Sequence, residues 1–74
     1  MSFSKLIKER RIELGLSQKA VGEAVGVDVA TVSRWESGKR TPSEVSMWEN
    51  ISENMGLPLI LIREEILNEL YPMP

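Results

Sequence analysis

Residues 17–38 read SQKAVGEAVGVDVATVSRWESG, and this stretch decides the fold. It contains two short amphipathic segments, 18–25 and 29–36, which are separated by only three residues. Ser17 and Asp28 directly precede these segments, and both are residue types that cap helix N-termini. The stretch therefore predicts two short helices that a tight turn forces to cross at a steep angle.

Glycines divide the chain into its segments. Four of them follow an apolar-periodic segment, where a left-handed helix C-cap is expected: Gly15, Gly26, Gly38 and Gly56. A fifth, Gly22, lies inside the segment 18–25, where it lowers helix propensity by about 1 kcal/mol relative to alanine. We expect a close helix crossing to require the small residue there.

A further helix is predicted over about 3–14, before the stretch that decides the fold. Ser2 is a good N-cap for it. One face is apolar and is expected to be buried: Phe3, Ile7 and Leu14. Its basic residues are expected to remain in solvent: Lys5, Lys8 and Arg10.

Two more helices are predicted after Gly38. The residues Thr41-Pro42-Ser43-Glu44 have the types of a capping box and predict a helix over about 42–55. Its buried face is expected to include Val45, Trp48 and Met55. The last helix is expected over about 58–70, because Pro72 cannot continue it.

The sequence thus predicts an all-α fold in a single domain that spans residues 1–74. Five helices are expected, over about 3–14, 18–25, 29–36, 42–55 and 58–70. The two tryptophans, Trp35 and Trp48, fall on apolar stripes, so we expect them in the core instead of on a surface that stacks bases.

Composition excludes several kinds of site. Neither cysteine nor histidine occurs, so disulfides, zinc sites of the common Cys/His type and histidine acid–base chemistry are absent, and we expect no cofactor and no enzymatic activity. No stretch reaches the roughly 18 apolar residues of a membrane span, so a cytoplasmic protein is expected.

Charge is unevenly distributed along the chain, although the net charge is only -2. Residues 1–42 carry eight lysines and arginines against five acidic residues, whereas residues 43–74 carry one arginine against six glutamates. The first part can therefore attract phosphates, which the net charge alone would argue against.

Three motifs resemble the Cro/C1-type (XRE) helix-turn-helix family, which includes lambdoid phage repressors. They are the Ser17-Gln18 opening, the Val25-Gly26 turn and the closing residues 35–39, Trp-Glu-Ser-Gly-Lys, in this order. The resemblance covers roughly residues 3–57. It implies a repressor-like domain with its helix-turn-helix at the second and third helices, and sequence-specific binding to double-stranded DNA.

The resemblance also assigns residues to the DNA. The helix over 29–36 would lie in the major groove and read bases with Val29, Ala30, Ser33 and Arg34. Arg34 can make two hydrogen bonds to a guanine, whereas Val29 and Ala30 can only contact a thymine methyl. Phosphates would be held by the start of the second helix, by the third helix and by the loop after it: Ser17, Gln18, Thr31, Ser37, Lys39, Arg40 and Thr41.

Two further residues have a structural role in this family. Arg11 and Glu36 match positions that form a partly buried salt bridge, which would tie the first helix to the end of the third. Gln18 is expected to brace the same helix as well as to lie near a phosphate.

The last helix is apolar on more sides than one small domain can bury. We therefore expect it to form a homodimer that binds a palindromic operator, through Leu59, Ile60, Leu61, Ile62, Ile66, Leu70 and Tyr71. The acidic residues Glu64, Glu65 and Glu69 would then stay away from the DNA.

The same helix leaves an alternative open. The chain could be an antitoxin-like or regulatory protein-interaction module, whose last helix binds a second protein. An enzyme is disfavoured, because no nucleophile–base pair can be assembled without histidine or cysteine and no glycine-rich phosphate loop is present.

Overall fold

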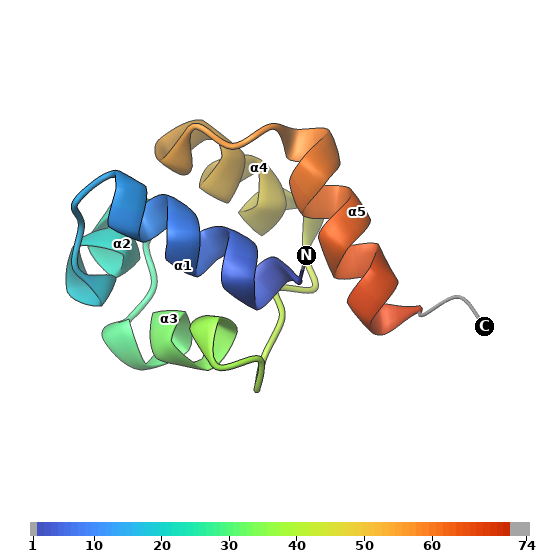
Figure 1. Cartoon of the computed structure of the whole chain (residues 1–74), viewed down its shortest axis with the longest axis horizontal. Coiled ribbons are helices and arrows are strands. Elements are labelled where there is room, and N and C mark those ends of the chain that lie inside the picture. The colour runs from blue at the N-terminus through green and yellow to red at the C-terminus, as the bar shows by residue number, and fades with distance from the viewer. Residues whose placement is uncertain (1, 72–74) are drawn as a thin grey trace.

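The computed structural model describes residues 2–71 and has five α-helices and no strand in that range (Figure 1). The helices are α1 (Phe3–Glu13), α2 (Gln18–Val25), α3 (Val29–Glu36), α4 (Val45–Met55) and α5 (Leu59–Leu70). The all-α fold is therefore confirmed, and α2 and α3 begin and end where the sequence predicts. Among the described residues, no helix combines the length and apolar character needed to cross a membrane.

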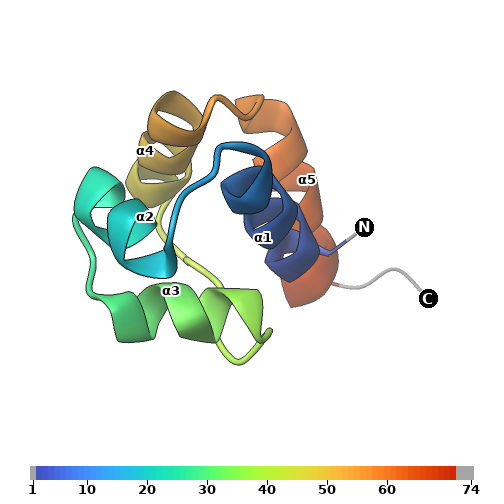
Figure 2. The same ribbon diagram turned by 60° about the vertical axis from the view of Figure 1, so that its left-hand side comes forward.

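All five helices contribute to one apolar core. The helix α3 packs against α2 and α1, while α5 packs against α1 and α4 (Figures 1 and 2). Both tryptophans are buried, and the ring of Trp35 packs edge-on against that of Phe3 with a centroid distance of 6.2 Å. The core side chains are Phe3, Leu6, Ile7, Val21, Val25, Val32, Trp35, Trp48, Ile51, Met55, Leu57, Ile62 and Ile66.

Local side-chain hydrogen bonds cap the N-termini of the first three helices. The side chains of Ser2, Ser17 and Asp28 each accept a hydrogen bond from the backbone N–H three residues on, as the sequence predicts. The four glycines expected at helix ends all have a positive φ, between 65° and 81°. Side chains that reach only a few residues along the chain therefore fix where these helices begin.

The helix α1 corrects two predictions. Leu14 was expected on the buried face but is 39% exposed. Leu6, which was not expected there, is buried. This follows because α1 ends at Glu13, so Leu14 already belongs to the turn. Arg10 is also not fully in solvent, since its Nε donates a hydrogen bond of 2.7 Å to the carbonyl of Met55 and ties α1 to the end of α4.

The predicted capping box is wrong, because α4 begins at Val45 and not at Pro42. Pro42 is buried, and its carbonyl accepts a hydrogen bond of 2.7 Å from Trp48 Nε1. Glu44 is the N-cap residue but makes no side-chain capping bond. Val45, expected in the core, is 55% exposed.

Gly22 is buried, but helix crossing is not the reason that a small residue is needed there. A Cβ at this position would lie 2.6 Å from the carbonyl oxygen of Val27, which belongs to the turn between α2 and α3. The carbonyl of Gly22 in turn accepts hydrogen bonds from the N–H groups of Gly26 and Val27. Gly22 therefore lets the turn between α2 and α3 lie closely against α2.

The predicted dimer surface also needs correction. Ile62 and Ile66 are completely buried in the core, because α5 packs this face against α1 and α4. Leu61 is half-buried. Four of the residues expected on that surface are exposed: Leu59, Ile60, Leu70 and Tyr71.

Candidate nucleic-acid interface

The outer face of α3 is open to solvent. Val32 and Trp35 anchor the inner face in the core, and Figure 2 shows α1, α2, α4 and α5 all above α3. The four residues expected to read bases are all exposed: Val29, Ala30, Ser33 and Arg34. Within residues 2–71, the side chain of Arg34 has no hydrogen bond or ion pair, so its guanidinium is available to a ligand.

A network around Glu36 holds α3 in place from behind. Its carboxylate accepts hydrogen bonds from Arg11 Nε at 2.7 Å, Arg11 Nη2 at 3.0 Å and Gln18 Nε2 at 3.1 Å. Arg11 Nη1 also donates to the carbonyl of Leu16. The network connects α1, the start of α2 and the end of α3, and it raises the pKa of Arg11 through the hydrogen bond to Glu36.

Asp28 stabilises the start of α3. One of its carboxylate oxygens accepts hydrogen bonds from both the hydroxyl and the backbone N–H of Thr31. These bonds favour the ionised form, the hydroxyl contributing most, and they lower the pKa of Asp28. The Thr31 hydroxyl, a predicted phosphate ligand, therefore already has an acceptor within the protein.

This cap predicts a pH dependence for the Asp28→Asn variant. The folded protein binds a proton at Asp28 less readily than the unfolded chain, so the contribution of Asp28 is complete above its unfolded pKa of about 3.9 and is lost as the pH falls through the lower, folded pKa. Asparagine accepts the same hydrogen bonds without titrating. We expect the difference in free energy of unfolding between wild type and variant to be constant above about pH 5 and to shift against the wild type below about pH 4.

Urea unfolding over a series of pH values measures that difference. A difference that stays constant down to about pH 2.5 would contradict the role of Asp28, because a lowered pKa requires it to change.

Several of the residues expected to bind phosphate are occupied by contacts inside the protein. The amide of Gln18 donates to Glu36, and the hydroxyl of Ser37 donates to the carbonyl of Arg34. The hydroxyl of Ser17 caps α2 as an acceptor and keeps its own proton for a ligand. Gln18 thus braces α3, which the sequence analysis had expected as one of its two roles.

Other donors remain open on the same side of the molecule. Lys39 and Arg40 are exposed, and within the described chain their side chains contact no acceptor. At the start of α2, the backbone N–H groups of Gln18 and Lys19 precede the first intrahelical hydrogen bonds and find no acceptor among residues 2–71. Lys19 was not among the predicted phosphate ligands, although it is an exposed cation in the first turn of a helix whose N-terminus is positive.

Thr41 has a partner that the sequence did not suggest. Its hydroxyl donates a hydrogen bond of 3.0 Å to Glu69 Oε2, at the end of α5. Glu69 was expected to lie away from the DNA, yet its carboxylate touches the loop that was expected to bind phosphate. The Thr41 hydroxyl is therefore engaged, and a negative charge lies next to it.

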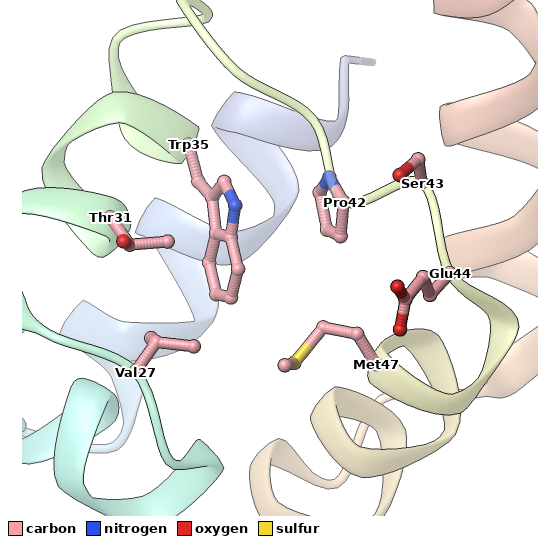
Figure 3. Close-up of a pocket in the computed structure, with 7 residues that line it drawn as sticks. All are labelled: Val27, Thr31, Trp35, Pro42, Ser43, Glu44 and Met47. Atoms are coloured by element: carbon pink, nitrogen blue, oxygen red, sulfur yellow. The ribbon is translucent and has the colours of Figure 1, made fainter.

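A hollow separates α3 from the start of α4. Its volume is about 220 Å³, and Thr31 and Trp35 line one side while Pro42 and Met47 line the other (Figure 3). Val27, in the turn between α2 and α3, contributes to the apolar wall. The loop before α4 is thus not packed tightly against α3 on this side.

Comparison with known proteins identifies the kind of domain that carries this surface. The helix-turn-helix family matches residues 7–59, which are well over half of the chain and include α2, the turn and α3. The chain belongs to this family. Membership confirms the predicted resemblance and the helix-turn-helix fold, and it makes DNA the expected kind of ligand.

The chain is also similar to the type II methyltransferase M1.ScrFI of Lactococcus lactis subsp. cremoris. The two are 38% identical over an alignment of 48 residues, and the match covers 61% of this chain but only 12% of the methyltransferase. No solved structure matches the chain.

Proposed function

We propose that this helix-turn-helix protein binds double-stranded DNA in a sequence-specific manner, with α3 in the major groove. The observation that carries the proposal is the open outer face of α3. There Arg34, whose side chain has no hydrogen bond or ion pair among residues 2–71, is exposed together with Val29, Ala30 and Ser33, while Val32 and Trp35 fix the helix to the core. A helix held this rigidly can present side chains to base edges in one defined register.

Base reading depends mainly on Arg34. A guanidinium can donate two hydrogen bonds to O6 and N7 of a guanine, which is worth about 1–3 kcal/mol of discrimination against other bases. Val29 and Ala30 have no side-chain donor and would contact thymine methyl groups, and Ser33 can bond to several base edges.

Phosphate binding would involve the open donors on either side of α3. Lys39 and Arg40 follow the helix, and the unpaired N–H groups at the start of α2 form an anion site next to Lys19. Ser17 can still donate its hydroxyl proton to a phosphate, because its Oγ only accepts a hydrogen bond from the Ala20 N–H, whereas the hydroxyl protons of Thr31, Ser37 and Thr41 are already donated within the protein.

We further propose that the protein acts as a homodimeric repressor in the cytoplasm. One helix of eight residues reads few base pairs, whereas two copies can bind palindromic half-sites about 34 Å apart. Four exposed apolar residues support α5 as the dimer contact: Leu59, Ile60, Leu70 and Tyr71. A dimer bound across an operator would exclude other proteins from the same DNA.

The exposed apolar residues of α5 also support the alternative of a protein-interaction module, in which a second protein covers them. We propose no methyltransferase activity, because the similarity to M1.ScrFI covers only 12% of that enzyme.

Selection from a random duplex pool, followed by anisotropy titrations at two salt concentrations, tests the main proposal. If no duplex is enriched, DNA recognition is wrong and the interaction module becomes the better candidate.

The variants Arg34→Ala and Lys39→Ala separate base reading from phosphate binding. We expect Arg34→Ala to lose about 1–3 kcal/mol of binding free energy on the selected operator and much less on operators changed at the guanine that Arg34 reads. Lys39→Ala should weaken binding to all sequences alike and lower the slope of log K against log salt by about 0.9.

The measurement is anisotropy with a panel of single-base operator variants at several salt concentrations. Base reading by Arg34 is wrong if its replacement weakens all operators equally. The phosphate role of Lys39 is wrong if the salt dependence does not change.

A further inference from the structure

The loop between α3 and α4, residues 37–44, carries part of the proposed phosphate-binding surface and has few anchors. At its start, the backbone N–H groups of Lys39 and Arg40 both donate to the carbonyl of Arg34. Near its end, the carbonyl of Pro42 accepts from Trp48 Nε1. Between these two anchors Thr41 is only half-buried, and from Pro42 onward the hollow of about 220 Å³ lies between the loop and α3 (Figure 3).

Glu69 supplies the third anchor from a distant part of the chain. Its Oε2 accepts the hydroxyl of Thr41 at 3.0 Å, and its Oε1 accepts the backbone N–H of Phe3 at 2.8 Å. That N–H lies in the first turn of α1, where backbone N–H groups have no acceptor within the helix and a negative charge is favourable. Figures 1 and 2 both show the start of α1 beside the last turns of α5. One carboxylate thus joins α5, α1 and the loop.

We infer that Glu69 is a positioning residue for the loop and links the phosphate contacts of Lys39 and Arg40 to the exposed end of α5. The inference rests on the function proposed above for these two residues. Leu70 and Tyr71 follow Glu69 directly and are 46% and 72% exposed. A second copy that covers them would order the last turn of α5, and with it the contact between Glu69 and Thr41.

The link acts in both directions, since a coupling free energy between two sites is reciprocal. Covering the end of α5 strengthens DNA binding, and DNA bound to the loop strengthens the association at α5. The alternative is that Glu69 only competes with phosphate for the Thr41 hydroxyl. In that case its carboxylate would weaken DNA binding instead of strengthening it.

Amide hydrogen exchange of the free protein, followed by NMR, tests the anchor without DNA. In Glu69→Ala and in Thr41→Val we expect the Lys39 and Arg40 amides to exchange about fivefold faster, which corresponds to the roughly 1 kcal/mol that a typical hydrogen bond contributes. The double variant should exchange no faster than either. Glu64→Ala is the matched control, because it removes an exposed carboxylate from the same helix and should leave these rates unchanged.

Thr41→Val keeps the test decisive if Glu69→Ala unfolds, because it leaves the bond from Phe3 to Glu69 intact. The anchoring role of Glu69 is wrong if the folded variants exchange at the same rates as Glu64→Ala. It is also wrong if the effects of the two single variants multiply in the double variant.

The affinity for the selected operator shows whether Glu69 strengthens or weakens DNA binding. We expect Glu69→Ala and Thr41→Val each to bind about fivefold more weakly than the wild type, with no further loss in the double variant. Tighter binding by Glu69→Ala overturns the inference, because Glu69 would then only compete with phosphate. If the wild type enriches no duplex, the proposed function fails, while the exchange rates still decide whether Glu69 anchors the loop.

Discussion

Glu36→Ala is expected to lower the free energy of unfolding by about 1–3 kcal/mol, the usual cost of leaving partly buried hydrogen-bond donors without their acceptor. The side chains of Arg11 and Glu36 are only 16% and 4% exposed, and the carboxylate accepts three hydrogen bonds. Without it, a guanidinium and the amide of Gln18 lose their acceptor in a place that water reaches poorly. For a domain of this size, the loss is a large part of the total stability.

Urea unfolding, followed by the fluorescence of the two buried tryptophans, measures this loss. Glu53→Ala is the matched control, because Glu53 is exposed and its replacement should change the free energy of unfolding by less than about 0.5 kcal/mol. Glu36→Gln should lie between the two, since it keeps one acceptor oxygen but loses the charge. Equal losses in Glu36→Ala and Glu53→Ala would show that the network contributes nothing.

The fold could be predicted from the sequence where the interacting residues lie only a few positions apart in the chain. Ser17 and Asp28 bond to backbone groups three residues away, so residue type alone indicates the starts of α2 and α3. The buried positions Val32 and Trp35 lie three apart on one helix face, which the hydrophobic period reveals. The fold and the orientation of α3 could therefore be predicted.

The prediction failed at the start of α4, where a distant contact overrides a local pattern. Thr41 and Pro42 have the residue types of a helix start, but their polar groups bond to Glu69 and Trp48 instead. Both partners lie outside the window in which a capping box is recognised. Only the packing of α4 and α5 brings these groups together.

The exposed surface of α5 could be predicted only in part. The run from Leu59 to Ile62 is apolar on every side, so the sequence could not indicate which residues face α1 and α4. The structure places Ile62 and Ile66 in the core, whereas Ile60 is 63% exposed. The surface that the homodimer proposal depends on is therefore narrower than expected, and it lies on the outer side of the helix.

This narrower surface makes Ile60→Glu the sharpest test of the homodimer. Ile60 has little contact with the core, so a charge there should leave the fold intact while it introduces repulsion between two acidic copies of α5. We expect the variant to sediment as a monomer. Its affinity for a palindromic operator should fall by about a hundredfold, because the second half-site then no longer adds to the binding of the first.

Ile12→Glu separates this effect from simple charge repulsion by DNA. It adds the same charge at an apolar residue of similar exposure, 59%, but on α1. We expect it to remain a dimer at tens of micromolar, as the wild type should, and to lose far less operator affinity than Ile60→Glu. Equal losses in the two variants, or a wild type that stays monomeric with and without operator, would rule out a dimer through α5. The exposed residues of that helix would then be best explained by a second protein, because an unpaired apolar face still needs a partner.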